Sequence, residues 1–346
     1  MALIGTEGDL SGVDLSGVNF EKQYQHFVMN KFGTESNRIV WHSKKGFLPE
    51  QEAMISIYDS ALMFGDMVFE MTRSFNRKHF KLAEHIDRLF RSAKFYKINP
   101  GISKEKLTEA IDWTCKVNED TLNPDDEWRL MINITRGIMP AYLKAGLKEN
   151  AGTNIIIAAF PLRWSVQGLG KDFAGVSSFV SSQRTISEQF VDPKVKNRAR
   201  VHYKFAYLEA AERGKNEWPI MMDEDGNIAE GPGYNFFIIK NNKVISPKGR
   251  NILRGISRSY IKELCETYDI RKRLEFKTKN FGIYDIVNAD GAFVTGTPFC
   301  MLPVVSIDGT LIGDGKRCGV FDYLLQKWSC NVDVDIAEQI RKWDSK

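Results

Sequence analysis

The residues best suited to chemistry form a short basic run, Lys194-Val195-Lys196-Asn197-Arg198-Ala199-Arg200. If the run is extended, its four cations recur at every second position and lie on one face. Like charges this close together repel, so that face must meet water, an acidic partner or an anionic ligand. An exposed edge strand protected by charge explains the same pattern. A nucleic-acid surface is a third interpretation, but no aromatic residues alternate with the cations to stack on bases.

Two further segments could hold an anion. Gly255-Ile256-Ser257-Arg258 opens an expected helix, where free backbone N–H groups and the helix dipole attract negative charge. Thr295-Gly296-Thr297 is a hydroxyl-rich turn after the apolar residues 292–294. An ordinary capped helix would also explain the first of these segments. Three anion-friendly features in one half of the chain nevertheless predict a phosphorylated ligand.

Several other chemistries have no support in the sequence. The five histidines include no pair with metal-ligand spacing and no H-E-x-x-H motif, so no metal site is expected. The Rossmann, P-loop and G-x-S-x-G motifs are absent, which disfavours nucleotide binding and serine-hydrolase chemistry. The five cysteines are far apart and include no C-x-x-C pair. They predict a reducing compartment rather than a disulfide framework.

Composition indicates a globular, cytoplasmic protein. The 346 residues carry 48 Lys and Arg against 44 Asp and Glu, a net charge of +4 that is too small for a dedicated nucleic-acid binder. No signal peptide is evident in residues 1–10, and the apolar stretch 155–162 is too short to span a bilayer. Neither a nucleic acid nor a membrane is therefore expected as a partner.

Periodicity predicts helices and strands without strict alternation, so the expected fold class is α+β. Apolar residues recur with helical spacing over 82–93, and a second helix is expected over 103–117. Asn241-Asn242 and Asp308-Gly309 are expected to be hairpin turns, and Ser257 to be an N-cap. Further strands are expected at 38–41, 129–135, 154–160 and 175–181, and a helix at 203–213.

The expected organisation has two domains. Residues 1–37 are interpreted as a surface extension and 38–160 as a small α+β domain. Residues 161–170, which contain Pro161 and two glycines, are the expected linker. The remaining residues, 171–346, form the larger domain.

The order and spacing of several motifs together resemble the class IV (fold-type IV) pyridoxal-phosphate aminotransferases, over about residues 38–326. This family includes branched-chain, D-amino-acid and (R)-amine enzymes. The resemblance implies a small N-terminal α/β domain, a larger C-terminal domain with a barrel-like β core, and a homodimer or higher oligomer. The motifs are F-G-D-M-V-F-E (64–70), H-I-D-R-L (85–89), V-K-N (195–197), E-A-A (209–211), E-G-P-G-Y-N (230–235), G-I-S-R (255–258) and L-P-V (302–304).

The resemblance also assigns roles to single residues. Lys196 looks like the lysine that binds pyridoxal 5'-phosphate as a Schiff base, because it lies 13 residues before the E-A-A motif. Glu230 would pair with the pyridinium nitrogen, and a neighbouring cation such as Arg198 could lower the pKa of the lysine. The residues expected to hold the cofactor phosphate are Arg88, the N–H groups of Ile256 and Ser257, and Thr297.

The positions expected to contact the substrate match no single subfamily of these enzymes. The carboxylate-binding Arg and His of D-amino-acid enzymes are replaced by Ala141 and Leu143, and Val201 stands where branched-chain enzymes have a cofactor-contacting tyrosine. Pro298 has no N–H to offer where branched-chain enzymes are believed to use backbone donors. A side chain is therefore expected to bind the substrate carboxylate. The candidate substrate-binding residues are Phe69, Arg73, Arg136, Arg198 and Pro298.

The resemblance implies transfer of an amino group from an amino acid to a 2-oxo acid in two half-reactions. An apolar or branched-chain L-amino acid with 2-oxoglutarate is the leading expectation. An (R)-amine or D-amino-acid transaminase and a lyase of the aminodeoxychorismate type share the same motifs. The alternative from another class is a non-enzymatic basic binding protein that uses 194–200 and 271–273.

Overall fold

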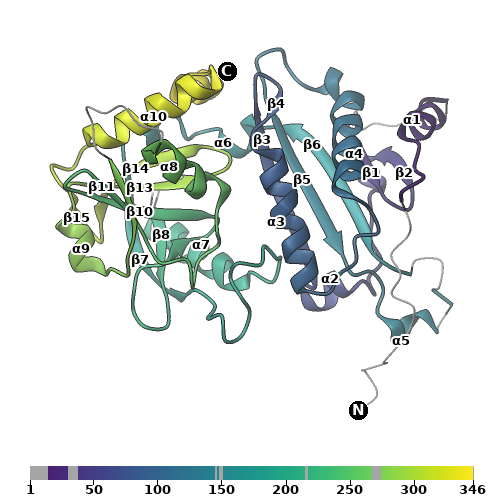
Figure 1. Ribbon diagram of the computed structural model, residues 1–346, viewed down its shortest axis with the longest axis horizontal. Helices are drawn as coiled ribbons and strands as arrows, with labels where there is room; N and C mark the ends of the chain where they lie inside the picture. The colour runs from purple at the N-terminus through teal and green to yellow at the C-terminus, as the bar shows by residue number, and fades with distance from the viewer. Residues whose placement is uncertain are drawn as a thin grey trace. The chain divides into compact units, whose positions relative to one another are not determined.

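The computed structural model describes residues 15–29, 38–144, 146–147, 151–214, 217–266 and 274–345. Its contacts divide the chain into two compact units (Figure 1). Unit 1 comprises Met1–Leu162 together with Val195–Ala199, and unit 2 comprises Arg163–Lys194 and Arg200–Lys346. The short segment Val195–Ala199 thus clusters with residues far from it in the sequence. The segment 161–170, expected to be a linker, contains the helical turn α6 (Arg163–Val166).

Unit 1 contains a six-stranded antiparallel sheet in the order β2-β1-β6-β5-β3-β4. Two helices, α3 and α4, pack on this sheet over a core of Val, Leu, Ile and Trp side chains (Figure 1). The strands are β1 (Ile39–His42), β2 (Gly46–Pro49), β3 (Met67–Phe75), β4 (Lys78–His79), β5 (Trp128–Thr135) and β6 (Asn154–Pro161). The helices are α1 (Phe20–Met29), α2 (Ser60–Phe64), α3 (Leu82–Phe95), α4 (Lys104–Val117) and α5 (Pro140–Leu143), with 3-10 turns at Glu50–Glu52 and Glu119–Thr121.

The expected surface extension is corrected by the structure in its described part, 15–29. Leu15 and Phe20 are 3% and 1% exposed and belong to the core of unit 1. The Phe20 ring packs edge-on against Trp41, with 5.5 Å between ring centroids. The apolar residues of L-S-G-V-D-L-S-G-V-N-F (10–20) recur every five positions, which is neither the helical nor the strand period, so the burial of Leu15 depends on the tertiary fold. Residues 1–14 and 30–37 lie outside the described residues.

Unit 2 contains a nine-stranded mixed sheet, in which β12-β11-β10-β13-β14-β7-β8 are neighbours and β9 and β15 pair with β10 and β14. In the described chain the path of neighbouring strands ends at β12 and β8 and does not close on itself, so the expected barrel-like core is not a closed barrel. The strands are β7 (Val176–Arg184), β8 (Glu217–Met222), β9 (Glu230–Gly231), β10 (Tyr234–Lys240), β11 (Lys243–Ser246), β12 (Glu275–Thr278), β13 (Gly291–Gly296), β14 (Cys300–Ile307) and β15 (Thr310–Leu311). The helices are α6, α7 (Val201–Arg213), α8 (Ile256–Glu266), α9 (Ile283–Val287), α10 (Gly319–Val332) and α11 (Ile336–Asp344), with a 3-10 turn at Gly170–Ala174.

Several local expectations are confirmed. The two expected hairpins form, with positive φ at Asn241, Asn242, Asp308 and Gly309, as such turns require. The helix expected over 82–93 is α3, and Ser103 caps α4 by accepting a hydrogen bond from the Lys106 N–H. The expected mixture of helix and sheet is also present.

Two local expectations are wrong. Helix α8 begins at Ile256, so Ser257 lies in its first turn and is not the N-cap. The run 194–200 is not a strand: it begins in a turn at Lys194, bends at Val195 and Arg198, and makes an isolated bridge at Asn197. Lys194 instead pairs with Glu188 and Asp192.

Candidate functional site

The backbone of Lys196 is fixed within unit 1 from two sides. Its carbonyl accepts the Phe69 N–H at 3.0 Å, and the next residue, Asn197, forms a bridge with Val68 of β3. On the other side, the Lys196 N–H donates to the Ser92 hydroxyl of α3 at 3.3 Å. A short irregular segment is therefore held by a strand and by a helix.

The side chains of Lys196 and Arg198 both meet the aromatic ring of Phe69. The Lys196 amine nitrogen lies 4.8 Å and the Arg198 guanidinium carbon 3.7 Å from the ring centroid, within cation–π range. Arg198 also donates to Asn133 Oδ1 at 3.1 Å. Asn133 is the register partner of Phe69 on β5, so these four residues lie together.

Arg88 lies in a buried cluster with Glu70 and His85. Arg88 Nε and one terminal nitrogen donate to the two Glu70 oxygens at 2.6 and 2.8 Å, and His85 Nδ1 is 2.7 Å from Glu70 Oε2. Burial by itself raises the pKa of Glu70, but Arg88 and His85 outweigh it and hold that pKa well below its usual range. Burial lowers the pKa of His85 despite Glu70, so the imidazole is neutral and donates its Nδ1–H.

Two further arginines of unit 1 are buried on neighbouring strands. Arg73 is 1% exposed and stacks over Phe75 at 3.8 Å, while its Nε donates to the Ser74 carbonyl. Its register partner Arg129 is 6% exposed, and the Nε atom of Arg129 has no hydrogen-bond partner. Burial, followed by the charge of Arg73, lowers the pKa of Arg129. This concentration of positive charge favours a neighbouring anion.

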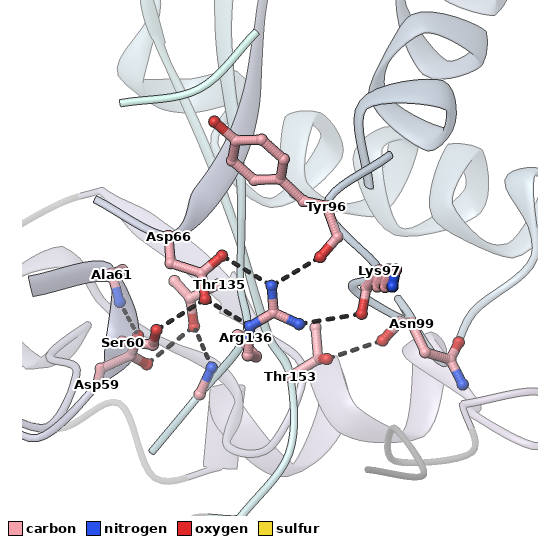
Figure 2. A network of polar contacts seen from close by, with 11 residues as sticks. Asp59, Ser60, Ala61, Asp66, Tyr96, Lys97, Asn99, Thr135, Arg136 and Thr153 are labelled. Carbon is pink, nitrogen blue, oxygen red and sulfur yellow. Dashed lines mark hydrogen bonds and ion pairs between the residues drawn. The ribbon is translucent and has the colours of Figure 1, made fainter. Parts of the chain in front are cut away.

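Arg136 has a different environment, shown in Figure 2. Its guanidinium forms a two-point ion pair with Asp66 and donates to the carbonyls of Tyr96 and Lys97 at 2.7 and 3.0 Å. Asp66 also accepts from the Ser60 hydroxyl at 2.7 Å. These contacts join the end of β5 to the start of β3 and the end of α3.

In unit 2, Glu230 is 3% exposed and accepts three hydrogen bonds from uncharged donors. The Tyr203 hydroxyl donates to Oε1 at 2.8 Å, and Oε2 accepts from Asn235 Nδ2 at 2.8 Å and from the Leu253 N–H at 3.0 Å. Hydrogen bonds to a carboxylate stabilise its charged form. The acid predicted from the sequence is thus held in a defined orientation.

Asn235 brings the other predicted residues of unit 2 close to Glu230. Its register partner on β13 is Thr295, two residues before Thr297. Gly255, just before α8, packs so closely that an added Cβ would lie 2.1 Å from Asn235 Oδ1. The first turn of α8, with Ile256 and Ser257, and the turn that holds Thr297 and Pro298 therefore flank the same asparagine.

These features of unit 2 fit a phosphorylated pyridine cofactor. Helix α8 is eleven residues long and presents backbone N–H groups at a glycine where no side chain fits, which suits a phosphate. The Thr295 hydroxyl is buried without a hydrogen-bond partner. A buried carboxylate, Glu230, lies within the same group of residues.

Sequence reasoning gave no role to several residues that hold the predicted ones, including Glu70, His85 and Asn133 of unit 1. Ser92 and Arg129 carry no local signal, because their partners are distant in the chain. Asn235 could have been found, since it ends the E-G-P-G-Y-N motif. Tyr203 could not, because a helical tyrosine two residues beyond the expected position has no motif of its own.

No group of three or more potential metal ligands occurs in the part of the chain that is described, and no described helix is long and apolar enough to cross a bilayer.

Comparisons with known proteins agree with the motifs. The sequence model of the amino-transferase class IV family matches residues 67–307. A Methanocaldococcus jannaschii protein, provisionally named a branched-chain-amino-acid aminotransferase, is 31% identical over 79% of this chain and 89% of its own length. A D-alanine aminotransferase of Staphylococcus haemolyticus is 26% identical over 78% of this chain and 89% of its own. The crystal structure of Escherichia coli branched-chain amino acid aminotransferase superposes with a TM-score of 0.72 at 25% identity, covering 84% of this chain and 93% of that one.

Proposed function

The chain belongs to the class IV aminotransferases, and from this membership we propose the residues and the substrates of its reaction. It is a pyridoxal-phosphate-dependent transaminase. The observation that carries the assignment of residues is the anchoring of Lys196, whose backbone is held by Phe69 and Ser92 while its amine lies over the Phe69 ring. A fixed backbone keeps the lysine in position while its amine binds and then releases a cofactor.

Each predicted residue has a proposed task. Glu230 holds its negative charge toward the pyridine nitrogen, and the N–H groups of Ile256 and Ser257 and the Thr297 hydroxyl bind phosphate. Arg88, oriented by Glu70, contributes positive charge to the phosphate. The bound cofactor supplies the electron sink that makes the substrate Cα–H acidic. The Lys196 amine then accepts that proton and returns it during the transfer.

For the substrate, we propose an apolar or branched-chain L-amino acid as donor and a 2-oxo acid such as 2-oxoglutarate as acceptor. The names of the M. jannaschii and E. coli proteins support this choice. The resemblance to D-alanine aminotransferases supports a second candidate, a D-amino-acid or (R)-amine enzyme. A panel of donors offered as both enantiomers distinguishes these two candidates, because only one enantiomer should convert the bound cofactor to its amine form.

Among the candidate carboxylate-binding residues, we favour Arg198. Its guanidinium lies on the same Phe69 ring as the Lys196 amine, whereas Arg136 forms a two-point pair with Asp66, and Arg73 lies over a different ring, that of Phe75. Arg129 adds positive charge to this region. We expect Arg198→Ala to raise the KM of the amino donor about 10- to 100-fold, as for loss of a charged hydrogen-bond pair. An unchanged KM would exclude Arg198.

The central assignment is tested by reduction with borohydride. Purified protein given pyridoxal phosphate should turn yellow, and reduction should fix the cofactor onto the peptide that contains Lys196. Lys196→Ala should abolish the label, whereas Lys204→Ala, which removes the lysine of α7, should retain it. A colourless protein that takes no label would contradict the assignment and favour the basic binding protein.

We further propose that the chain forms a homodimer. Large apolar side chains are exposed within eleven residues of unit 1, namely Met54, Ile57, Leu62, Met63 and Phe64, with exposed fractions of 44–67%. Such a patch is typical of a protein interface. Light scattering after gel filtration should give a dimer for the wild type and a monomer for the double variant Leu62→Asp, Phe64→Asp.

A cytoplasmic location is also proposed. All five cysteines are free thiols, and three of them are buried, which suits a reducing compartment. Fractionation of cells that make the native chain should recover it with cytoplasmic markers.

A further inference from the structure

The sequence lacks a tyrosine at the position where the branched-chain enzymes that it resembles have one. Val201 occupies that position, as the first residue of α7, and its side chain is 65% exposed. Two residues further along the same helix, Tyr203 directs its hydroxyl group to Glu230. The Tyr203 hydroxyl therefore contacts Glu230 from a position at which the family motifs do not require a tyrosine.

The hydrogen bonds of Glu230 are divided between its two oxygens. Oε2 accepts from Asn235 and from the Leu253 backbone, whereas the Tyr203 hydroxyl donates to Oε1 over 2.8 Å. Asn235 and Leu253 belong to the strand and loop beside Glu230, but Tyr203 comes from α7, which begins five residues after Lys196. Tyr203 thus links the helix that follows the lysine to the carboxylate.

The surroundings of Tyr203 keep its proton in place. Burial, and then the negative charge of Glu230, raise the pKa of Tyr203 well above its usual value, although the nearby Arg200 acts in the opposite direction. The Arg200 guanidinium lies over the Tyr203 ring at 4.3 Å. The neighbouring His202 is neutral, because burial lowers its pKa to about 4. From α8, Arg258 also interacts electrostatically with Glu230. Tyr203 therefore remains a donor at every working pH.

We propose that Tyr203 is a positioning residue that acts through Glu230 and sets how strongly this carboxylate pairs with the ring nitrogen of the bound cofactor. A donated hydrogen bond engages part of the carboxylate's charge and fixes its rotation. Without it, more negative charge faces the ring, and the cofactor holds its protons more tightly. This inference rests on the proposed roles of Lys196 and Glu230.

The test is Tyr203→Phe, which removes only the hydroxyl group. Bound pyridoxal phosphate changes its absorbance with pH, and the midpoint of that change should rise by about half a pH unit in the variant. We expect kcat to fall about tenfold, because the carboxylate loses its fixed rotation, while the KM values stay within about twofold. The melting temperature of the cofactor-free protein should fall by no more than about 2 °C.

A matched control is Tyr207→Phe, on the same helix. The Tyr207 hydroxyl donates to the Pro232 carbonyl, close to Glu230 in sequence but not on its carboxylate. This variant should leave the absorbance midpoint where it is in the wild type. A Tyr203→Phe midpoint that is unmoved or lowered overturns the inference, provided that borohydride labels Lys196 in the wild type. Failure of that wild-type labelling would instead overturn the proposed function.

Discussion

The two units hold their functional residues by different forces. In unit 1, Glu70 is fully buried between Arg88 and His85, and the contacts that orient Arg88 are ionic. In unit 2, Glu230 is equally buried, but the donors on its oxygens are a phenol, an amide and a backbone N–H. One carboxylate is thus bonded directly to a buried guanidinium, and the other accepts hydrogen bonds from neutral groups.

The difference has an energetic consequence. A buried ion pair is costly to assemble and more costly to break, because removing one partner leaves the other charged and unsolvated. The Glu230 carboxylate accepts hydrogen bonds from neutral donors and also attracts the charge of Arg258, and its removal leaves Tyr203, Asn235 and Leu253 without this acceptor. We therefore expect Glu70 to be important mainly for folding and Glu230 mainly for chemistry.

The largest effect is expected from Glu70→Gln. This change leaves the buried Arg88 guanidinium without its counter-charge and should lower the free energy of unfolding by about 3–5 kcal/mol. Urea unfolding followed by tryptophan fluorescence measures it. The control is Glu50→Gln, which breaks the partly exposed pair with Arg38 and should cost no more than about 1 kcal/mol. Equal losses in the two variants would show that the Glu70 cluster is not a stabilising ion pair.

The same isosteric change in unit 2, Glu230→Gln, should have the opposite effect, with a small loss of stability and a large loss of activity. The amide opposes one donor with another, which costs about 1–2 kcal/mol of stability. The loss of charge toward the cofactor nitrogen should lower kcat about 100-fold or more. Single-turnover absorbance with an amino donor measures the rate, and urea unfolding measures the stability. A stability loss as large as that of Glu70→Gln would remove the distinction between the units.

Local pattern was sufficient for several elements of both units. Helix α3, which carries Arg88, follows from its apolar spacing, and the turn at Asn241-Asn242 follows from the tolerance of asparagine for positive φ. The motif positions of Arg88 and Glu230 are both buried, as expected of residues that hold a cofactor. Their functional roles stay predictions.

The partners of those residues could not be predicted from local pattern. Arg136 and Asp66 are 70 residues apart, and nothing near either residue indicates the ion pair. Lys194 to Arg200 alternates like a strand, yet Val195–Ala199 docks on β3 and α3 of unit 1, which fixes its path by tertiary contacts. Leu15 and Phe20 are core residues in a segment whose composition is that of a loop. In each case, contacts between distant residues override the local pattern.

Acid should weaken unit 1 through His42 of β1. This side chain is 3% exposed and its Nδ1 accepts the Lys44 N–H at 3.1 Å, so protonation would break a hydrogen bond. Burial, assisted by Lys45 and Lys44, lowers its pKa to about 4. The unfolded chain therefore binds the proton first, and stability is lost as the pH falls from about 6.5 toward 4, by about 2 kcal/mol at pH 5.

Hydrogen exchange at pH 7 and pH 5, corrected for intrinsic rates, measures this effect. Protection of β1 should fall more at pH 5 than protection of β10, where no histidine is present. In His42→Gln the difference between the two strands should shrink. A wild-type β1 whose protection is independent of pH would show that His42 is not coupled to folding.

The smallest effect is expected from Arg136→Ala, which sharpens the comparison within unit 1 itself. Arg136 and Asp66 are 28% and 19% exposed, so water partly replaces the lost contacts, unlike at Arg88. The two-point pair and the two carbonyl contacts should together contribute about 1–2 kcal/mol to the free energy of unfolding. Because these contacts hold the start of β3, we expect the KM of the amino donor to stay within about twofold of the wild-type value. Arg136→Lys keeps the charge but not the two-point geometry, so it should recover less than half of the lost stability.

A large rise in KM for Arg136→Ala with no loss of stability would make Arg136 a substrate-binding residue and would remove the reason to prefer Arg198.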